Sequence, residues 1–132
     1  MPLQHELKRI RLNLARSKEF PSGSEQRGYE FVAPLDRNGH IDPVLWRKYR
    51  DRCRVRRFWP GSDDEAGHLV HQPGGAQHAS WAFHYDGTPK EDDEAGYRFG
   101  THVFVPGEYV SIKDHDNDEI HTFRVASVES AV

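Results

Sequence analysis

Apolar and polar residues alternate in several segments of this chain, and this alternation is the period of a β-strand with one buried face. The first such segment is KRIRLNLARS, in which Ile10, Leu12 and Leu14 are separated by polar residues. A helix would place these three side chains on no common face. The loop FPSGSEQRG and a second predicted strand in GYEFVAPLD, residues 28–36, follow.

One short helix is expected near residues 42–51. Asp42 and Pro43 suit the N-cap and the first helical position. The apolar stripe of this helix would consist of Val44, Leu45, Tyr49 and Trp46. After the helix, RCRVRRFW alternates Cys53 and Val55 with arginines, which predicts a third strand.

From residue 66 onward, turn signals recur about every ten residues, which is the spacing of an antiparallel meander. Further strands are expected in GHLVHQ, HASWAFHYD, YRFGTHVFV, EYVSIKD and IHTFRVASVE, and DGTPKEDDEAG is expected to be an acidic surface loop. The chain is therefore predicted to be mainly β, a small antiparallel barrel-like meander of about eight strands, because closure removes exposed strand edges. A two-sheet sandwich is the alternative architecture.

The composition fits one domain spanning residues 1–132, since 15 aromatic residues offset a low mean hydropathy of -0.86. No apolar run approaches the roughly 20 residues of a membrane span, and the N-terminal segment is charged where a signal peptide is apolar, so a cytoplasmic location is expected. Cys53 is the single cysteine, which excludes an intrachain disulfide and a thiolate metal cluster.

The charges divide the chain into two halves. Residues 1–58 carry a net charge of +7, and residues 59–132 carry a net charge of -10. Such asymmetry indicates a nucleic-acid partner, a basic half that folds against an acidic half, or two halves on opposite faces of one domain.

The basic charge is densest in WRKYRDRCRVRRFW. In the predicted strand Arg52, Arg54 and Arg56 form a row on one face, with a spacing of about 6 to 7 Å that matches phosphates along a strand of RNA or DNA. Arg57 and Trp59 complete this candidate site for an anion or a nucleic acid. The alternative is a row paired with carboxylates of an adjacent strand, and a pI near 6.3 favours that alternative.

Nine histidines suggest a second candidate site. If Gly74 and Gly75 form the centre of a hairpin turn, His71 faces His78. His84 would lie on the same face, and His102 could be a further ligand of a divalent metal, although a shift of one residue in register removes the pairing.

The stretch DHDNDE resembles the start of a calcium loop in its first five positions. Glu119 stands where such a loop needs Gly, and Val125 where it needs Glu, so a solvated hairpin turn is expected instead.

Several runs, RIRLNLARSKEFPSGS, GYEFVAPLD, GYRFGTHVFVPGEYVSI and HTFRV, resemble those of a small family of uncharacterised bacterial proteins, and this resemblance implies no activity and no site residues. The run FVPGEYVSI is similar to the first-strand motif of the flavin-binding barrel of ferredoxin reductase-like enzymes, but the downstream Arg-x-Tyr-Ser stretch of those enzymes is missing. His102, Glu108 and His121 resemble cupin ligands without the two-histidine opening motif of cupins.

The sequence therefore predicts a non-catalytic binding or interaction module whose partner is a small molecule or a protein, held in the interior or at the mouth of a barrel. One alternative is a metal-dependent enzyme with a histidine-rich site. The other is RNA or single-stranded DNA binding through the arginine row. Binding to a membrane is not expected.

Overall fold

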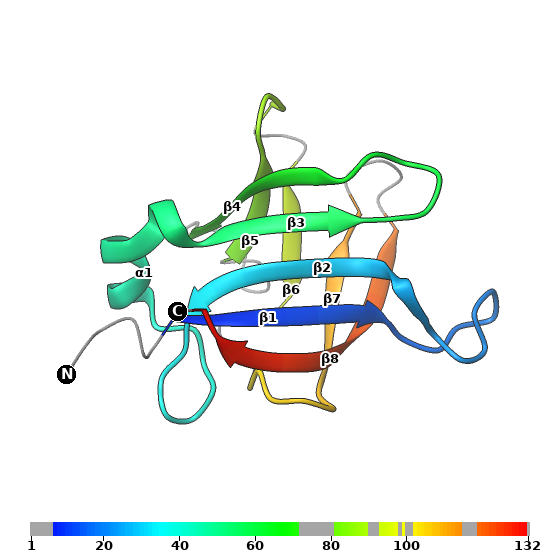
Figure 1. Ribbon diagram of the computed structural model, residues 1–132, viewed down its shortest axis with the longest axis horizontal. Coiled ribbons are helices and arrows are strands. Elements are labelled where there is room, and N and C mark those ends of the chain that lie inside the picture. The colour runs from blue at the N-terminus through cyan, green and yellow to red at the C-terminus, as the bar shows by residue number, and fades with distance from the viewer. Residues whose placement is uncertain are drawn as a thin grey trace.

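The chain folds into a closed barrel of eight antiparallel strands in sequential order, with one short helix at one end (Figure 1). The computed structural model describes residues 7–71, 81–89, 93–97, 99, 102–114 and 119–131. The strands are β1 (Leu7–Leu14), β2 (Ser24–Pro34), β3 (Arg54–Phe58), β4 (Glu65–His71), β5 (Trp81–Tyr85), β6 (Glu94–Tyr97), β7 (Tyr109–Lys113) and β8 (Ile120–Ser130). No helix among the described residues is long and apolar enough to cross a membrane.

Pairing of the first strand with the last closes the barrel, which confirms the predicted architecture and makes the two-sheet sandwich wrong. Arg9 pairs with Glu129 and Leu14 with Phe123 along this closing seam. The predicted alternation in β1 is confirmed, because Ile10 and Leu12 are fully buried.

Aromatic rings fill the interior of the barrel. The most deeply buried large side chains are Trp81, Tyr29, Tyr85, Phe31, Phe83, Phe99, Phe104, Phe123, Ile10, Leu12, Leu69 and Ile112. The ring centroids of Phe31 and Phe83 are 5.1 Å apart, and those of Tyr29 and Phe123 are 5.0 Å apart, so these rings are in direct contact. The interior is a packed core at this level of the barrel.

The helix α1 (Pro43–Tyr49) closes one end, and one turn of 3₁₀ helix, Arg50–Arg52, continues it. The Asp42 carboxylate accepts hydrogen bonds from the amides of Val44 and Leu45, at 2.9 and 3.2 Å, which confirms the predicted N-cap. The predicted apolar stripe is wrong at Val44, which is 76% exposed.

Trp46 is the buried residue of α1. Its indole N–H donates to the carbonyl of Leu69 at 2.9 Å, and its ring meets that of Trp81 edge to face at 5.5 Å. The single turn from Asp42 to Trp46 therefore positions the indole over the open end of the barrel.

The predicted strand YRFGTHVFV, residues 97–105, is wrong. Strand β6 ends at Tyr97, and residues 102–105 are not part of a strand. Phe99 and Phe104 are buried because they pack into the core from a loop, 5.2 Å apart, and the Phe99 ring occupies the space beside Gly96 where a side chain would lie. Alternating aromatics thus resemble a strand, although Phe99 lies in a turn and Phe104 lies outside any strand.

Candidate functional site

A charged cluster lies inside the barrel, at the end opposite α1. Arg57 points inward from β3, because it shares a face with Val55, and it is only 7% exposed. Glu94 on β6 is fully buried, and Asp114 directly after β7 is 6% exposed. We call Arg57, Glu94, Asp114, Glu65 and the two tyrosines Tyr29 and Tyr85 the buried arginine cluster.

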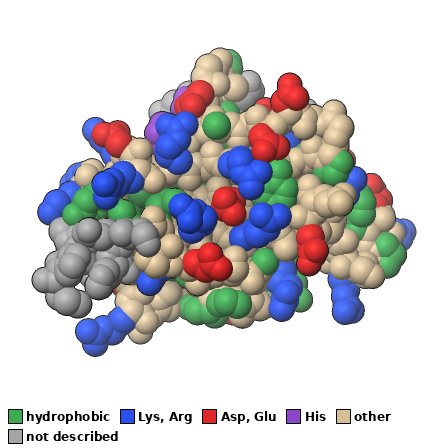
Figure 2. All heavy atoms as spheres, in the orientation of Figure 1, with side chains coloured by type: hydrophobic (Ala, Val, Ile, Leu, Met, Phe, Trp, Pro, Cys, Tyr) green, Lys and Arg blue, Asp and Glu red, His purple; other side chains and the backbone are tan. Residues whose placement is uncertain are grey.

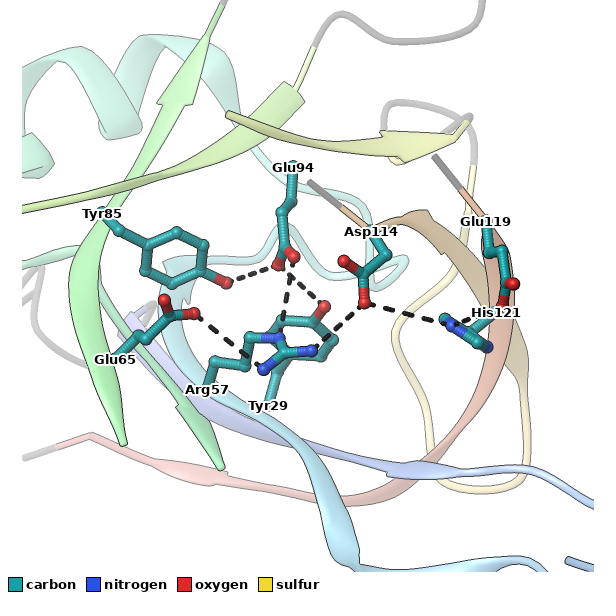
Figure 3. Close-up of polar contacts among 8 residues, drawn as sticks. All are labelled: Tyr29, Arg57, Glu65, Tyr85, Glu94, Asp114, Glu119 and His121. Atoms are coloured by element: carbon teal, nitrogen blue, oxygen red, sulfur yellow. Dashed lines mark hydrogen bonds and ion pairs between the residues drawn. The ribbon is translucent and has the colours of Figure 1, made fainter. Parts of the chain in front are cut away.

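The guanidinium of Arg57 lies between three carboxylates (Figure 3). Its Nη2 donates to Asp114 Oδ2 at 3.2 Å. Its Nε lies 3.6 Å from Glu94 Oε2, and its Nη1 lies 3.9 Å from Glu65 Oε2. Burial lowers the pKa of Arg57, but the neighbouring oxygens of Tyr29, Glu94 and Asp114 outweigh that effect and raise the pKa, so the group stays charged. Buried charges are tolerated only when they are paired in this way.

The two tyrosine hydroxyls complete the coordination of Glu94 (Figure 3). Both donate to Oε1, Tyr29 at 2.8 Å and Tyr85 at 2.6 Å. Burial raises the pKa of each tyrosine well above 10, and the negative charge of Glu94 raises it further. Both phenols therefore remain protonated donors that hold the carboxylate in place.

The outer edge of the cluster reaches the mouth of the barrel through His121. Its Nε2 lies 4.0 Å from Asp114 Oδ2 and 3.7 Å from Glu119 Oε2. Trp59 covers the cluster, with its ring 4.8 Å from the guanidinium carbon of Arg57 and 6.0 Å from the His121 ring. These contacts fix two mouth residues, an indole and an imidazole, against the buried charges.

A hollow of about 510 Å³ opens above these two residues. It is lined by Leu14, Ala15, Arg16, Ser17, Lys18, Glu19, Phe20, Arg27, Trp59, Glu119, Ile120, His121 and Thr122. Most of these residues belong to the end of β1 and the connection from β1 to β2. The others lie in β2, directly after β3, and at or just before the start of β8, and these segments meet at one end of an antiparallel barrel. We call this feature the mouth hollow. The end of β1 and the start of β2, which contribute to it, lie at the end of the barrel opposite α1 (Figure 1).

The predicted arginine row is divided by the fold. The third strand begins at Arg54, so Arg52 belongs to the 3₁₀ turn and its placement in a strand is wrong. Arg57 faces inward in the buried arginine cluster, and Trp59 lies in the mouth hollow. Only Arg54 and Arg56 share the outer face of β3.

Both outward arginines are paired with carboxylates. Arg54 donates to Asp86 at 3.0 Å, and Arg56 donates to Asp64 at 2.9 Å and lies 3.8 Å from Glu30. Figure 2 shows this face, where basic and acidic side chains are interspersed instead of forming a basic patch. Two of the partners come from the acidic half of the chain, as expected for pairing within one domain.

The histidine prediction is corrected by the register of β4 and β5. His71 pairs with Trp81, and His68 pairs with His84, so the pairing centred on Gly74 and Gly75 is wrong. Because side chains alternate between faces, His71 and His84 lie on opposite faces of the sheet. Between residues 7 and 131, the described parts of the chain contain no group of three or more His, Cys, Asp or Glu side chains that could hold a metal ion.

The individual histidines have other neighbours. The ring of His71 lies tilted against that of Trp81, with the centroids 4.4 Å apart. Burial, followed by the charge of Arg47, lowers the pKa of His71. His84 Nδ1 lies 2.6 Å from Asp93 Oδ1 on the outside of the barrel. His102 is half-buried, and His78 lies outside the described residues.

Sequence reasoning missed the most buried members of the site. Glu94 was expected in a solvated acidic loop, and Asp114 in a solvated turn, but both point into the barrel. No local signal separates them from the neighbouring acidic residues, because their burial depends on Arg57 from a distant strand. Arg57 itself carried a signal: it follows Val55 by two positions and so shares its inward face.

Comparison with known protein families, with curated proteins and with solved structures found no match for this chain. The resemblance to a small bacterial family therefore stays a prediction. The fold and the site define a class of protein: a closed, eight-stranded, up-and-down antiparallel barrel with a packed aromatic core. The Trp46 indole covers the core at one end, and a buried charge cluster lies beneath a hollow at the other.

Proposed function

We propose that this protein is a binding module for a small organic molecule and that its ligand site is the mouth hollow. The observation that carries the proposal is the half-buried indole of Trp59, which lines a hollow of about 510 Å³ together with Phe20, Arg27 and His121. Sites for small molecules are concave, largely apolar and equipped with a few fixed polar groups, and hollows of this size are typical of them. The aromatic interior itself is packed, so the mouth replaces it as the proposed site.

Fixed side chains support binding at this place. Trp59 and His121 are held from below by the charges of Arg57 and Asp114. Side chains that are already ordered lose little conformational entropy when a ligand binds. The same contacts favour a binding role over catalysis, because the polar atoms of Glu94 are directed at Arg57 and the two tyrosines rather than at the hollow.

The paired state of Arg54 and Arg56 argues against the nucleic-acid alternative. A phosphate backbone would have to displace Asp86 and Asp64 from these guanidinium groups before binding. We therefore expect no association with mixed RNA or single-stranded DNA oligonucleotides, even at low salt, where phosphate contacts are strongest.

A fragment titration followed by NMR tests the proposal on the full chain labelled with ¹⁵N. The probes are indole, 2-naphthol, benzoate and benzamidine, which share a flat ring and differ in charge. At least one probe is expected to shift the amides of residues 14–20 and 119–122 and the indole N–H of Trp59. The variant Trp59→Ala should abolish these shifts, whereas the matched change Trp46→Phe at the opposite end should preserve them. Absence of localised shifts with all four probes, or shifts confined to the α1 end, would refute the proposal.

A further inference from the structure

Arg27 lies in the barrel wall without a carboxylate partner, unlike Arg56 and Arg57. Among the residues that the structure describes, no carboxylate oxygen lies within 4.0 Å of its guanidinium, whereas Arg56 and Arg57 each have at least one. Its Nη1 donates to Ser24 Oγ at 3.1 Å, and its Nε is buried without a hydrogen-bond partner. The contacts within the chain thus leave the charge and one N–H group of Arg27 unsatisfied.

Two aromatic rings hold this guanidinium in the wall of the mouth hollow. Its central carbon lies 4.2 Å from the centroid of the Phe20 ring and 5.9 Å from that of the Trp59 ring. Stacking contributes cation–π attraction but uses only the faces of the planar group. The N–H groups at its edge remain the donors for an acceptor, and a planar guanidinium suits the two oxygens of a carboxylate or a similar oxyanion.

Positive charges outnumber negative charges among the residues that line the hollow. Arg16 and Lys18 join Arg27 as permanent cations in its wall, against the carboxylates of Glu19 and Glu119. Glu119 lies 3.7 Å from His121, so one of the two carboxylates is directed at an imidazole. The hollow therefore combines an excess of positive charge with flat apolar surface.

We infer that the mouth hollow selects organic anions with a flat, unsaturated body: the oxyanion accepts hydrogen bonds from the edge of Arg27, and the body stacks on Trp59. This inference rests on the proposed function and adds the chemical class of the ligand. An unpaired, half-buried guanidinium is unfavourable in the free protein, because a buried donor without an acceptor destabilises the fold. The buried Nε is out of reach of a ligand, but Nη2 is not buried and has no hydrogen-bond partner among the described residues. An anionic ligand would supply a charged acceptor at Nη2, whereas a neutral ligand of the same shape supplies only an uncharged one.

The test compares 2-naphthoate with 2-naphthamide, two probes with the same ring system and different charge. Binding of each is measured by NMR titration of the full ¹⁵N-labelled chain, with the Trp59 indole N–H as the reporter. A charge-assisted hydrogen bond contributes about 1.5 to 3 kcal/mol, so 2-naphthoate is expected to bind about tenfold more tightly or better. Arg27→Gln should weaken 2-naphthoate by a similar factor and change 2-naphthamide less than about twofold.

Two further variants separate charge from geometry and from folding. Arg27→Lys keeps the charge but loses the two-pronged donor, so it should bind 2-naphthoate with intermediate affinity. Arg54→Gln removes an arginine from the outer wall, away from the hollow, and should bind both probes as the natural chain does.

The outcomes distinguish the inference from the function on which it depends. If both probes bind at Trp59 with equal affinity and Arg27→Gln affects neither, the inference is refuted while the proposed function stands. If neither probe shifts the Trp59 indole, the proposed function fails and the inference fails with it.

Discussion

Replacement of Arg57 by methionine is the sharpest test of the buried arginine cluster. The change keeps much of the side-chain volume but leaves Glu94, which is fully buried, and Asp114, which is 6% exposed, without the cation between them. Removing one partner from a buried ion pair destabilises a protein by about 3 to 5 kcal/mol. Since typical domains unfold with about 5 to 15 kcal/mol, Arg57→Met should remove a large part of the total stability.

The neighbouring arginine provides a matched control on the same strand. Arg56 has a 43% exposed side chain, and its pairs with Asp64 and Glu30 lie at the surface. Exposed ion pairs contribute about 0 to 1 kcal/mol, and the contact of Arg56 with the Phe58 ring at 4.9 Å adds about 0.5 to 1 kcal/mol. Arg56→Met should therefore cost at least about 1 kcal/mol less than Arg57→Met.

Urea unfolding followed by tryptophan fluorescence and circular dichroism measures both changes. The midpoint should fall much further for Arg57→Met, with little change in the slope of the unfolding free energy against urea. The double variant Arg57→Met, Glu94→Met should be less destabilised than the sum of its single changes by about 1 kcal/mol or more, because the two residues are in contact. Equal losses for Arg56→Met and Arg57→Met, or strict additivity in the double variant, would refute the assignment of a buried, coupled charge cluster.

Three further predictions concern the core. Because the pKa values of Tyr29 and Tyr85 are raised, only the unfolded chain ionises these phenols above pH of about 10. The unfolding free energy should therefore fall as pH rises beyond that value, and these two phenols should not affect it at lower pH. The phenolate absorbance of the folded protein should correspond to fewer than its five tyrosines until the protein unfolds. Burial raises the pKa of Cys53 to about 12, and a thiol reagent at neutral pH should modify this residue only after denaturation. A Cβ at Gly67 would lie 1.9 Å from a backbone carbonyl oxygen of the adjacent strand, so Gly67→Ala should destabilise the protein by about 3 kcal/mol or more. Gly107→Ala is the control: its Cβ would meet no atom, but φ is 97°, and we expect a loss of about 1 kcal/mol. Equal effects of the two changes in thermal unfolding would contradict this explanation.

The barrel could be predicted from the sequence because its strands are specified locally. Alternation in β1 and the Asp42–Pro43 start of α1 require only neighbouring residues, and the structure confirms both. Where a side chain enters the core from a loop, the same alternation is misleading: Phe99 and Phe104 are buried without being part of a strand. Alternating apolar residues therefore indicate a strand only where the backbone between them is extended.

The site could be predicted only in part, because its contacts join distant segments. The sequence indicated that the basic and acidic halves are complementary, and Arg54 and Arg56 do pair with Asp86 and Asp64. It did not indicate which carboxylates would be buried, since Glu94 has acidic neighbours with the same local composition. The histidine pairing failed for a related reason: register depends on the length of the β4–β5 connection, and a shift of an odd number of residues exchanges the faces of the sheet.

The two ends of the barrel are closed by different chemistry, and the difference bears on function. At the α1 end, Trp46 closes the core with one hydrogen bond and apolar contact, which shows that this fold needs no charge to seal an end. A buried ion-pair cluster is often no more stabilising than apolar residues of the same volume, so stability alone does not explain Arg57 and its carboxylates. What the cluster does provide is a fixed position for Trp59 and His121, because each lies against one of its charges. We therefore propose that the buried charges hold the floor of the mouth hollow. If the hollow is the ligand site, a change in these charges should alter ligand binding there even in variants that remain folded.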